Sequence, residues 1–231
     1  MRKTEFADDE YYHIFNRGVD KRKIFSDKYD LQRFFQSMKE FNTVEPIGSI
    51  YENSFEKDKD KNHQLGASGA KLVEFTAYCL NPNHYHFILK QAHEKGIEKF
   101  MQKLGAGYTS YFNIKNKRTG VLFQGSFKSV HIDSNEQLLY ASSYVNLNFK
   151  VHQLGARSAK LWKSSWGEYV GENNENFCKK DIILDQFKNK NEYKKYAMES
   201  LDLILENKKR KKEDEDEDKT EKENGQELFL E

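Results

Sequence analysis

Hydrophobic and polar positions along the first forty residues predict a strand followed by a helix. Residues 11–16 (Tyr-Tyr-His-Ile-Phe-Asn) are rich in strand-forming side chains, and residues 17–20 (Arg-Gly-Val-Asp) have the composition of a turn. Apolar residues then recur at helical spacing, and either Ser26 or Asp27 can cap the start of that helix. The apolar positions of this helix are Leu31, Phe34, Phe35, Met38 and Phe41.

The central part of the chain predicts two strand-forming regions with a helix between them. Residues 44–70 are polar, contain Gly and Ser, and are expected to be a connecting insertion. A strand-forming region is centred on residues 73–90, a helix is predicted over about 97–113, and a strand over 127–132. The side chains available to pack this helix are Phe100, Met101, Leu104, Tyr108, Tyr111 and Phe112.

The remaining elements complete the expected fold class. Ser134 and Gln137 match the S-x-x-Q capping box at the start of a helix that runs through Tyr140, Tyr144 and Asn148. Residues 162–169 are aromatic and predicted to be extended, and short helices are predicted at 182–187 and 192–205. This succession of strands and helices predicts an α+β fold, with a ferredoxin-like (split βαβ) antiparallel sheet and helices mainly on one face.

Charge and composition divide the chain into a main domain and two C-terminal segments. We expect one domain over residues 1–170, a helical extension over 171–206, and a disordered charged tail, or a frayed helix extension, over 207–231. The tail carries seven basic and ten acidic residues, so the net charge of +1 hides a mildly basic body. That excess is weak evidence for an anionic partner.

The chain has the composition of a cytoplasmic protein. Hydrophobic residues make up 37% and aromatic residues 14% of the chain, which is enough for a core, but no apolar run is long enough to span a membrane. The N-terminal residues lack the apolar stretch of a signal peptide. Two cysteines, Cys79 and Cys178, are too few for a disulfide framework or a cysteine-based zinc site.

A histidine pair in the strand-forming region is the first candidate for chemistry. His84 and His86 are two residues apart, so in a strand their imidazoles project from the same face. Two imidazoles on one rigid face form half of a metal site. The spacing alone also fits two ordinary buried or surface histidines. Further candidate ligands are needed before a metal site is predicted.

Tyr144 and Asn148 are the candidates for that second half. They are four residues apart on the predicted helix and therefore share one face. A tyrosine hydroxyl becomes a nucleophile when a base or cation favours its phenolate, and an amide oxygen is able to ligate a cation. Spacing does not show that this helix faces the histidines, and Tyr144 is equally consistent with core packing.

Two sequence blocks resemble those of a known enzyme family. Residues 80–89 (Leu-Asn-Pro-Asn-His-Tyr-His-Phe-Ile-Leu) and 144–148 (Tyr-Val-Asn-Leu-Asn) are similar to the two signature blocks of the single-tyrosine HUH transposases of IS200-like insertion sequences. The REP-associated tyrosine transposases are the branch that the chain resembles most. The stretches 108–113 and 120–128, and residues 12–18 near the N-terminus, are also similar to the family, so the resemblance covers about residues 9–170.

The resemblance implies an activity, a cofactor and a partner. It implies that His84, His86 and Asn148 hold Mg²⁺ or Mn²⁺, and that Tyr144 attacks single-stranded DNA to form a 5′-phosphotyrosine and a free 3′-hydroxyl. It also implies strand transfer during DNA transposition, substrates with hairpin ends, a prokaryotic nucleoid location, and a monomer or homodimer. Phe149 departs from the proline that the family usually has after the asparagine. Tyr140 is an alternative nucleophile one helical turn earlier, but it lacks an asparagine four residues further on.

Basic and aromatic residues near these blocks are candidates for holding the DNA. Single strands bind to basic grooves that also offer aromatic side chains for base stacking. The candidates are Arg17, Lys21, Arg22, Tyr108, Tyr111, Arg118 and Lys128. Each is also consistent with ordinary surface or core positions.

Two alternatives to a mobile-element transposase remain open from the sequence. One is a domesticated REP-type nicking enzyme, and the other is a non-catalytic module that binds single-stranded nucleic acid. A separate observation fits none of these functions: residues 63–72 and 152–161 match at eight of ten positions. This repeat has no functional explanation from the sequence.

Overall fold

A computed structural model of the protein describes all residues except 1–4, 46, 48–49, 51–68, 153–160 and 228–231. The strands are β1 (Tyr11–Arg17), β2 (Val73–Asn81), β3 (His84–Gln91), β4 (Lys128–Ile132) and β5 (Lys163–Ser164). The main helices are α1 (Lys28–Glu40), α3 (Gly96–Lys115), α4 (Asn135–Asn146), α5 (Asn148–Val151) and α8 (Lys190–Glu227). Shorter helical segments are η1 (Val19–Lys21), α6 (Trp166–Val170) and α7 (Asp181–Leu184).

The strands form one antiparallel sheet in the order β4-β1-β3-β2-β5. Strands β1 to β4, with α1 after β1 and α3 after β3, form the split βαβ arrangement expected from the sequence. Strand β5 adds a two-residue pairing at the outer edge of β2. The α+β, ferredoxin-like prediction is therefore confirmed.

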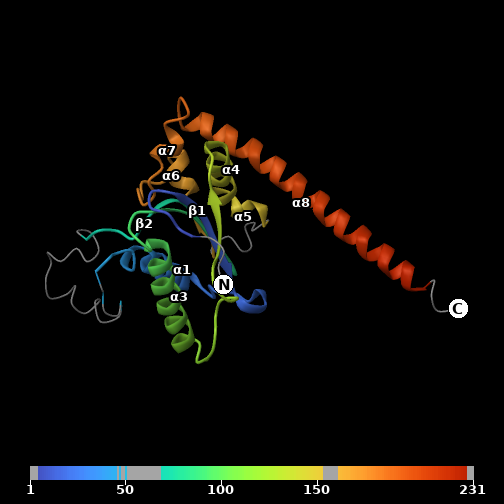
Figure 1. The fold of residues 1–231 in the computed structure, drawn as a ribbon, viewed down its shortest axis with the longest axis horizontal. Coiled ribbons are helices and arrows are strands. Elements are labelled where there is room, and N and C mark those ends of the chain that lie inside the picture. The colour runs from blue at the N-terminus through green and yellow to red at the C-terminus, as the bar shows by residue number, and fades with distance from the viewer. Residues whose placement is uncertain (1–4, 46, 48–49, 51–68, 153–160, 228–231) are drawn as a thin grey trace.

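Helices cover both faces of this sheet, which corrects the expectation that they lie mainly on one face (Figure 1). Helices α1 and α3 pack on one face over a core that includes Ile14, Phe87 and Tyr108. Helices α4 to α8 pack on the other face, over a second core that includes Ile88 and Val145. Strand β3 is buried on both faces for most of its length, so a helical layer is needed on each face of the sheet.

The strand-forming region at 73–90 is a hairpin of two strands, because Pro82 and Asn83 turn the chain between β2 and β3. Proline lacks the N–H group that a ladder position would need, and the carbonyl of Pro82 instead accepts hydrogen bonds from the backbone of Ile24 and Phe25. The turn is thereby tied to the segment that precedes α1. It places Asn81 directly opposite His84 in the register of the hairpin.

Helix caps follow the local sequence. Asp27 is the residue that caps α1, and its side chain accepts hydrogen bonds from the backbone N–H groups of Tyr29 and Asp30. Ser134 caps α4 by accepting from the backbone N–H of Gln137, and the Gln137 side chain accepts from the backbone of Asp133. The capping box thus closes one residue earlier than its usual pattern.

The predicted helix over 134–148 is divided in two. Helix α4 ends at Asn146, Leu147 leaves the helical region with φ −104° and ψ 11°, and Asn148 begins α5. Tyr144 and Asn148 therefore lie on successive helices. The ring of Phe149 stacks on Trp162, with centroids 3.8 Å apart and an interplanar angle of 5°, and this contact holds α5 against the segment that leads into β5.

Helix α8 supports α4 from the solvent side (Figure 1). Buried Tyr193 of α8 bonds through its hydroxyl to Ser142 and to the side-chain amide of Asn146. Asn146 in turn accepts a hydrogen bond from Ser165, so a chain of buried polar contacts joins α8, α4 and the start of α6. These bonds fix the position of α4 relative to the sheet.

Residues 162–169 are mostly not extended: β5 has two residues, and α6 follows it. Helix α8 continues to Glu227, so the charged segment that begins at residue 207 is helical over most of its length. Within the described part of the chain, no helix is long and apolar enough to cross a membrane. The insertion at 44–70 and both copies of the repeated segment lie largely outside the described residues.

Candidate active site

Strand β3 presents its two histidines on the sheet face covered by α4. Its side chains alternate, so His84 and His86 point to that face while Tyr85 and Phe87 point into the core beneath α1 and α3. In the pairing with β1, Phe15 lies opposite His86. The ring centroids of His84 and His86 are 5.2 Å apart, and the two rings are nearly perpendicular.

Asn148 meets His84 at the end of the hairpin. The side-chain oxygen of Asn148 lies 3.1 Å from Nε2 of His84, and the amide nitrogen of Asn81 lies within hydrogen-bond distance of both atoms, at 2.7 and 2.9 Å. On the far side of the ring, Nδ1 of His84 is 2.7 Å from the side-chain oxygen of Asn83. An amide oxygen only accepts, so Nδ1 carries the proton and Nε2 presents its lone pair beside the Asn148 oxygen.

Tyr144 lies over the second histidine. Its ring packs edge-on against His86, with centroids 5.5 Å apart, and against His13 at 5.8 Å. Burial raises the pKa of the Tyr144 phenol, and the neighbouring Asn148 side chain acts in the opposite direction. Tyr140, one turn earlier, is 44% exposed. The structure thus brings Tyr144, His84, His86 and Asn148 together.

The imidazoles of this site are neutral at physiological pH. Burial lowers the pKa of His13 to about 4, and burial together with neighbouring imidazoles lowers the pKa of His86 well below its ordinary value. The pKa of His84 is also lowered by burial, against the effect of the nearby Asn148 oxygen, which favours the protonated ring. Burial, with the nearby His84 and Lys208, lowers the pKa of His152 to about 4. Neutral imidazoles are the form that binds metal ions.

A cleft of about 580 Å³ opens beside the two histidines. Its lining residues are Phe15, Asn16, Arg17, Lys21, Asn83, His84, His86, Gln124, Lys128 and His152. Three of them are cationic and none is acidic, so the described wall of the cleft attracts anions. Arg17 is held in place by a hydrogen bond from its guanidinium to Gln124.

The other sequence candidates for DNA contact lie elsewhere. Tyr108 is fully buried and donates a hydrogen bond to the carbonyl of Ile24, so the expectation that it stacks on bases is corrected. Tyr111 donates to Asp30 of α1 on the opposite face of the sheet. Arg118 is engaged with Asn113 and the carbonyl of Val121, and Arg22 pairs with Asp20. Only Arg17, Lys21 and Lys128 of that set line the cleft.

Four residues of the site were missed by the sequence analysis. Asn81 ends β2 and Asn83 lies in the turn, His13 contacts His86 from β1, and the ring of His152 lies 4.4 Å from that of His84. The two asparagines stand within the block 80–89, where their position beside His84 was a usable signal. His152 begins the second copy of the repeated segment, and nothing in the sequence links it or His13 to the site.

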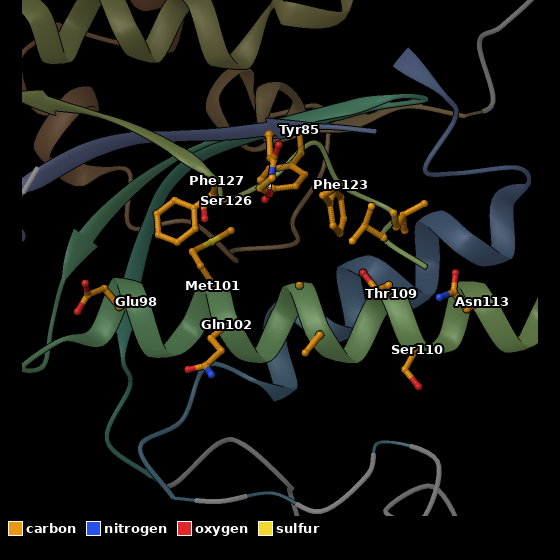
Figure 2. A pocket seen from close by; sticks show the side chains of 16 residues that line it. Tyr85, Glu98, Met101, Gln102, Thr109, Ser110, Asn113, Phe123, Ser126 and Phe127 are labelled. Carbon is orange, nitrogen blue, oxygen red and sulfur yellow. Dashed lines mark hydrogen bonds between the residues drawn. The ribbon is translucent and has the colours of Figure 1, made fainter. Parts of the chain in front are cut away.

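A second cavity, of about 670 Å³, lies on the other face of the sheet, between α3 and the loop that follows it. Figure 2 shows Met101, Thr109 and other side chains of α3 along one side of this cavity, facing Tyr85 of β3 and Phe123. Asn16 lines both cavities, and its amide donates to the carbonyl of Gly125 in the wall between them. The basic cleft and this aromatic cavity are therefore neighbours on opposite sides of one loop.

The donor set around His84 fits a divalent cation. Two neutral imidazoles and an amide oxygen are suitable ligands for such ions, and the separation of His84 Nε2 and the Asn148 oxygen is close to the roughly 3.0 Å between adjacent ligands of an octahedral magnesium or manganese ion. The buried Nδ2 of Asn148 has no hydrogen-bond partner, because the bond from Asn81 fixes the oxygen toward His84. Among the described residues, no group of three or more His, Cys, Asp or Glu side chains is arranged to bind a metal, and the third donor of this set is the amide oxygen of Asn148.

A comparison with protein families agrees with the resemblance. Residues 49–148 match the model of the family described as "Transposase IS200 like", and this match ends at Asn148. No curated protein matches the sequence. Solved structures that match include a REP-associated tyrosine transposase bound to a REP hairpin, with 11% identity and a TM-score of 0.49. That match covers 74% of this chain and 85% of the other.

Proposed function

We propose that this protein cleaves and rejoins single-stranded DNA with Tyr144 as the nucleophile, a proposal supported by the match of residues 49–148 to the model of IS200-like transposases. The observation that carries the proposal is the meeting of Asn148 with His84, 3.1 Å apart, beside a Tyr144 ring that packs on His86. These residues come from β3, α4 and α5. The two histidines among them also line the basic cleft.

The covalent step exchanges one phosphoester for another. The Tyr144 oxygen attacks phosphorus and loses its proton, the bond from phosphorus to the 3′-oxygen breaks, and that oxygen leaves with a proton as a 3′-hydroxyl. In the reverse direction, a 3′-hydroxyl of another strand attacks the phosphotyrosine and releases Tyr144. The number of phosphoester bonds is unchanged, so rejoining requires no nucleotide cofactor.

His84, His86 and Asn148 would hold a divalent cation, Mg²⁺ or Mn²⁺, which supplies a Lewis acid that polarises the phosphodiester. Neighbouring residues of the chain orient two of these three ligands. Asn83 holds His84 in the tautomer whose Nε2 is free, and Asn81 orients the Asn148 oxygen toward it. The pKa of Tyr144 is raised by burial, so its phenol is not activated by the protein alone.

The substrate that this site fits is an unpaired DNA strand next to a hairpin end. Arg17, Lys21 and Lys128 would bind its phosphates, since they are the cations of the cleft. Tyr144 packs on His86 of the same chain, and α8 fixes the helix that carries it. We therefore assign the reaction to a monomer whose tyrosine acts on its own metal site.

Covalent trapping tests the proposal. A 5′-labelled and a 3′-labelled single strand with a hairpin are incubated with the full chain and Mn²⁺ or Mg²⁺, and products are separated under denaturing conditions. We expect a protein–DNA adduct that carries the label 3′ to the cut, its loss in Tyr144→Phe, and its retention in Tyr140→Phe, because Tyr140 is exposed and lies outside the site.

Two outcomes would contradict the proposal. An adduct that disappears in Tyr140→Phe and persists in Tyr144→Phe would move the nucleophile. Hairpin binding without any adduct, across both metals and a panel of hairpins, would instead favour a non-catalytic binding module. Whether an active enzyme is domesticated or mobile is decided by hairpin sequences flanking its own gene.

A further inference from the structure

A third histidine touches the proposed metal site without belonging to it. His13 stands on β1, two residues before Phe15, and projects to the same sheet face as His86. Nε2 of His13 lies 2.9 Å from Nδ1 of His86, and the two rings are nearly parallel, with centroids 5.1 Å apart. This is the hydrogen bond that the structure gives to the His86 ring.

The position of the proton between Nε2 of His13 and Nδ1 of His86 determines whether His86 is able to bind a metal through Nε2. If His13 donates, the proton on Nε2 of His13 points at Nδ1 of His86, and a neutral His86 must then carry its own proton on Nε2. If His13 accepts, His86 carries its proton on Nδ1 and leaves Nε2 with a free lone pair. Only the second arrangement lets His86 bind a metal from the side that lines the cleft.

His84 shows the same arrangement with a simpler partner. The oxygen of Asn83 faces Nδ1 of His84 and only accepts, so that ring already has its Nε2 free. For the two histidines to act together, His86 needs an acceptor at Nδ1 as well. Among the described residues, His13 is the group placed there.

We propose that His13 is a positioning residue that accepts the Nδ1 proton of His86 and thereby keeps Nε2 of His86 free for the divalent ion. The inference rests on the proposed function of the site. Outer partners of this kind set the tautomer and orientation of a ligating imidazole, and their loss typically weakens metal binding by about 10- to 100-fold. His13 also packs against Tyr144, so it fixes the distance between nucleophile and ligand from the same position.

Three variants separate the hydrogen bond from the packing. His13→Phe keeps a ring against His86 and Tyr144 but has no acceptor, whereas His13→Gln retains an acceptor of similar reach. His131→Phe is the matched control, because His131 lies on the neighbouring strand β4 and pairs with Glu10 on the opposite sheet face. Thermal melting of each variant verifies that the chain is folded.

Two measurements other than activity test whether His13 accepts the Nδ1 proton of His86. The first is Mn²⁺ affinity by calorimetry: we expect a loss of roughly 10- to 100-fold in His13→Phe, recovery of most of the affinity in His13→Gln, and no change in His131→Phe. The second is the nitrogen-15 imidazole spectrum of the Mg²⁺-loaded protein. There we expect a protonated Nδ1 in His86 and an unprotonated Nε2 in His13.

A His86 ring protonated at Nε2, or a folded His13→Phe variant with wild-type Mn²⁺ affinity, would overturn the role of His13. A wild-type chain that binds neither ion would overturn the metal site of the proposed function instead. The imidazole spectrum of that metal-free protein would still decide for or against His13 as the acceptor.

Discussion

The amide nitrogen of Asn81 lies 2.7 Å from the side-chain oxygen of Asn148, although 67 positions separate the two residues. This bond determines which end of the Asn148 amide faces His84, because a nitrogen turned that way would leave two donors in contact. The hairpin therefore supplies both a candidate ligand and the group that orients another one.

Replacing Asn148 with Ala should remove the oxygen ligand. We expect Mn²⁺ affinity to fall by roughly 10- to 100-fold or more, since loss of an outer partner alone costs about that much. Covalent adduct formation should fall with it. Asn113→Ala on α3 is the matched control, because Asn113 bonds only to the loop beyond its helix and to Arg118. Unchanged Mn²⁺ affinity in Asn148→Ala would remove this residue from the metal set.

Replacing Lys128 with Ala should weaken binding of single-stranded DNA of any sequence. Lys128 lines the basic cleft, and each phosphate contact to a single strand contributes about 0.7 to the slope of log affinity against log salt. We expect the slope to decrease by about that amount. Lys99→Ala on the opposite side of the sheet is the comparison, and an equal decrease there would show that the effect is not specific to the cleft.

Replacing Tyr108 with Phe should affect stability and leave DNA binding intact. The hydroxyl of Tyr108 donates to the carbonyl of Ile24 at 2.6 Å inside the core, and its removal leaves that acceptor unpaired. The expected cost is about 1–3 kcal/mol in the free energy of unfolding, measured with urea. Tyr29→Phe, at a position 61% exposed, should cost almost nothing. A Tyr108→Phe variant with unchanged stability would contradict a contribution of this buried hydrogen bond to folding.

Replacing Asp27 with Asn should change how stability depends on pH. The pKa of Asp27 lies below its ordinary value of 3.8, mainly because Lys115 donates a hydrogen bond to it. A lowered folded-state pKa contributes stability above the unfolded-state pKa, and this contribution is lost as pH falls through the folded value. Asn keeps the cap of α1 without the charge.

Wild type should therefore be more stable than Asp27→Asn at neutral pH, and the difference should shrink as the pH falls below the ordinary pKa of an aspartate. Urea unfolding at several pH values measures it. A constant difference between the two proteins across this range would mean that the pairing with Lys115 contributes nothing to folding.

Replacing Tyr193 with Phe should loosen the helix that carries the nucleophile. The Tyr193 hydroxyl bonds to Ser142 and Asn146, both buried on α4. We expect the free energy of unfolding to fall by about 1–3 kcal/mol. Relative to wild type, amide hydrogen exchange should accelerate more in α4 than in α3. Tyr196→Phe on the same helix is the control. Equal acceleration of exchange in α3 and α4 would indicate global destabilisation instead.

The sequence predicted those features of the fold that local chemistry determines. Asp27 and Ser134 cap helices where their side chains suggested it, and the order of strands and helices was sufficient to predict the split βαβ sheet. The turn at Pro82 was not anticipated, because the apolar residues on both sides continue the same strand-forming pattern. Residue spacing likewise did not reveal that α4 ends before Asn148, since both halves remain helical.

Contacts between distant segments account for the remaining differences. His13 and His86 are 73 positions apart, and no local pattern distinguishes His13 from an ordinary strand residue. The sequence around Tyr108 does not show whether its hydroxyl is exposed to solvent or bonded to a buried carbonyl. The second layer of helices was not predicted for the same reason. Helix α8 joins this layer through Tyr193, whose hydrogen-bond partners on α4 are some fifty positions away.

The alternation along β3 has a consequence for insertions and deletions. His84 and His86 face the cleft, while Tyr85 and Phe87 fill the opposite core. One residue added between Phe87 and Ile88, with the rest of the strand kept in register, would exchange the two sets, placing imidazoles in the aromatic core and aromatic rings at the cleft. No single later substitution would reverse that exchange. This short stretch of strand therefore tolerates changes of side chain far better than changes of length.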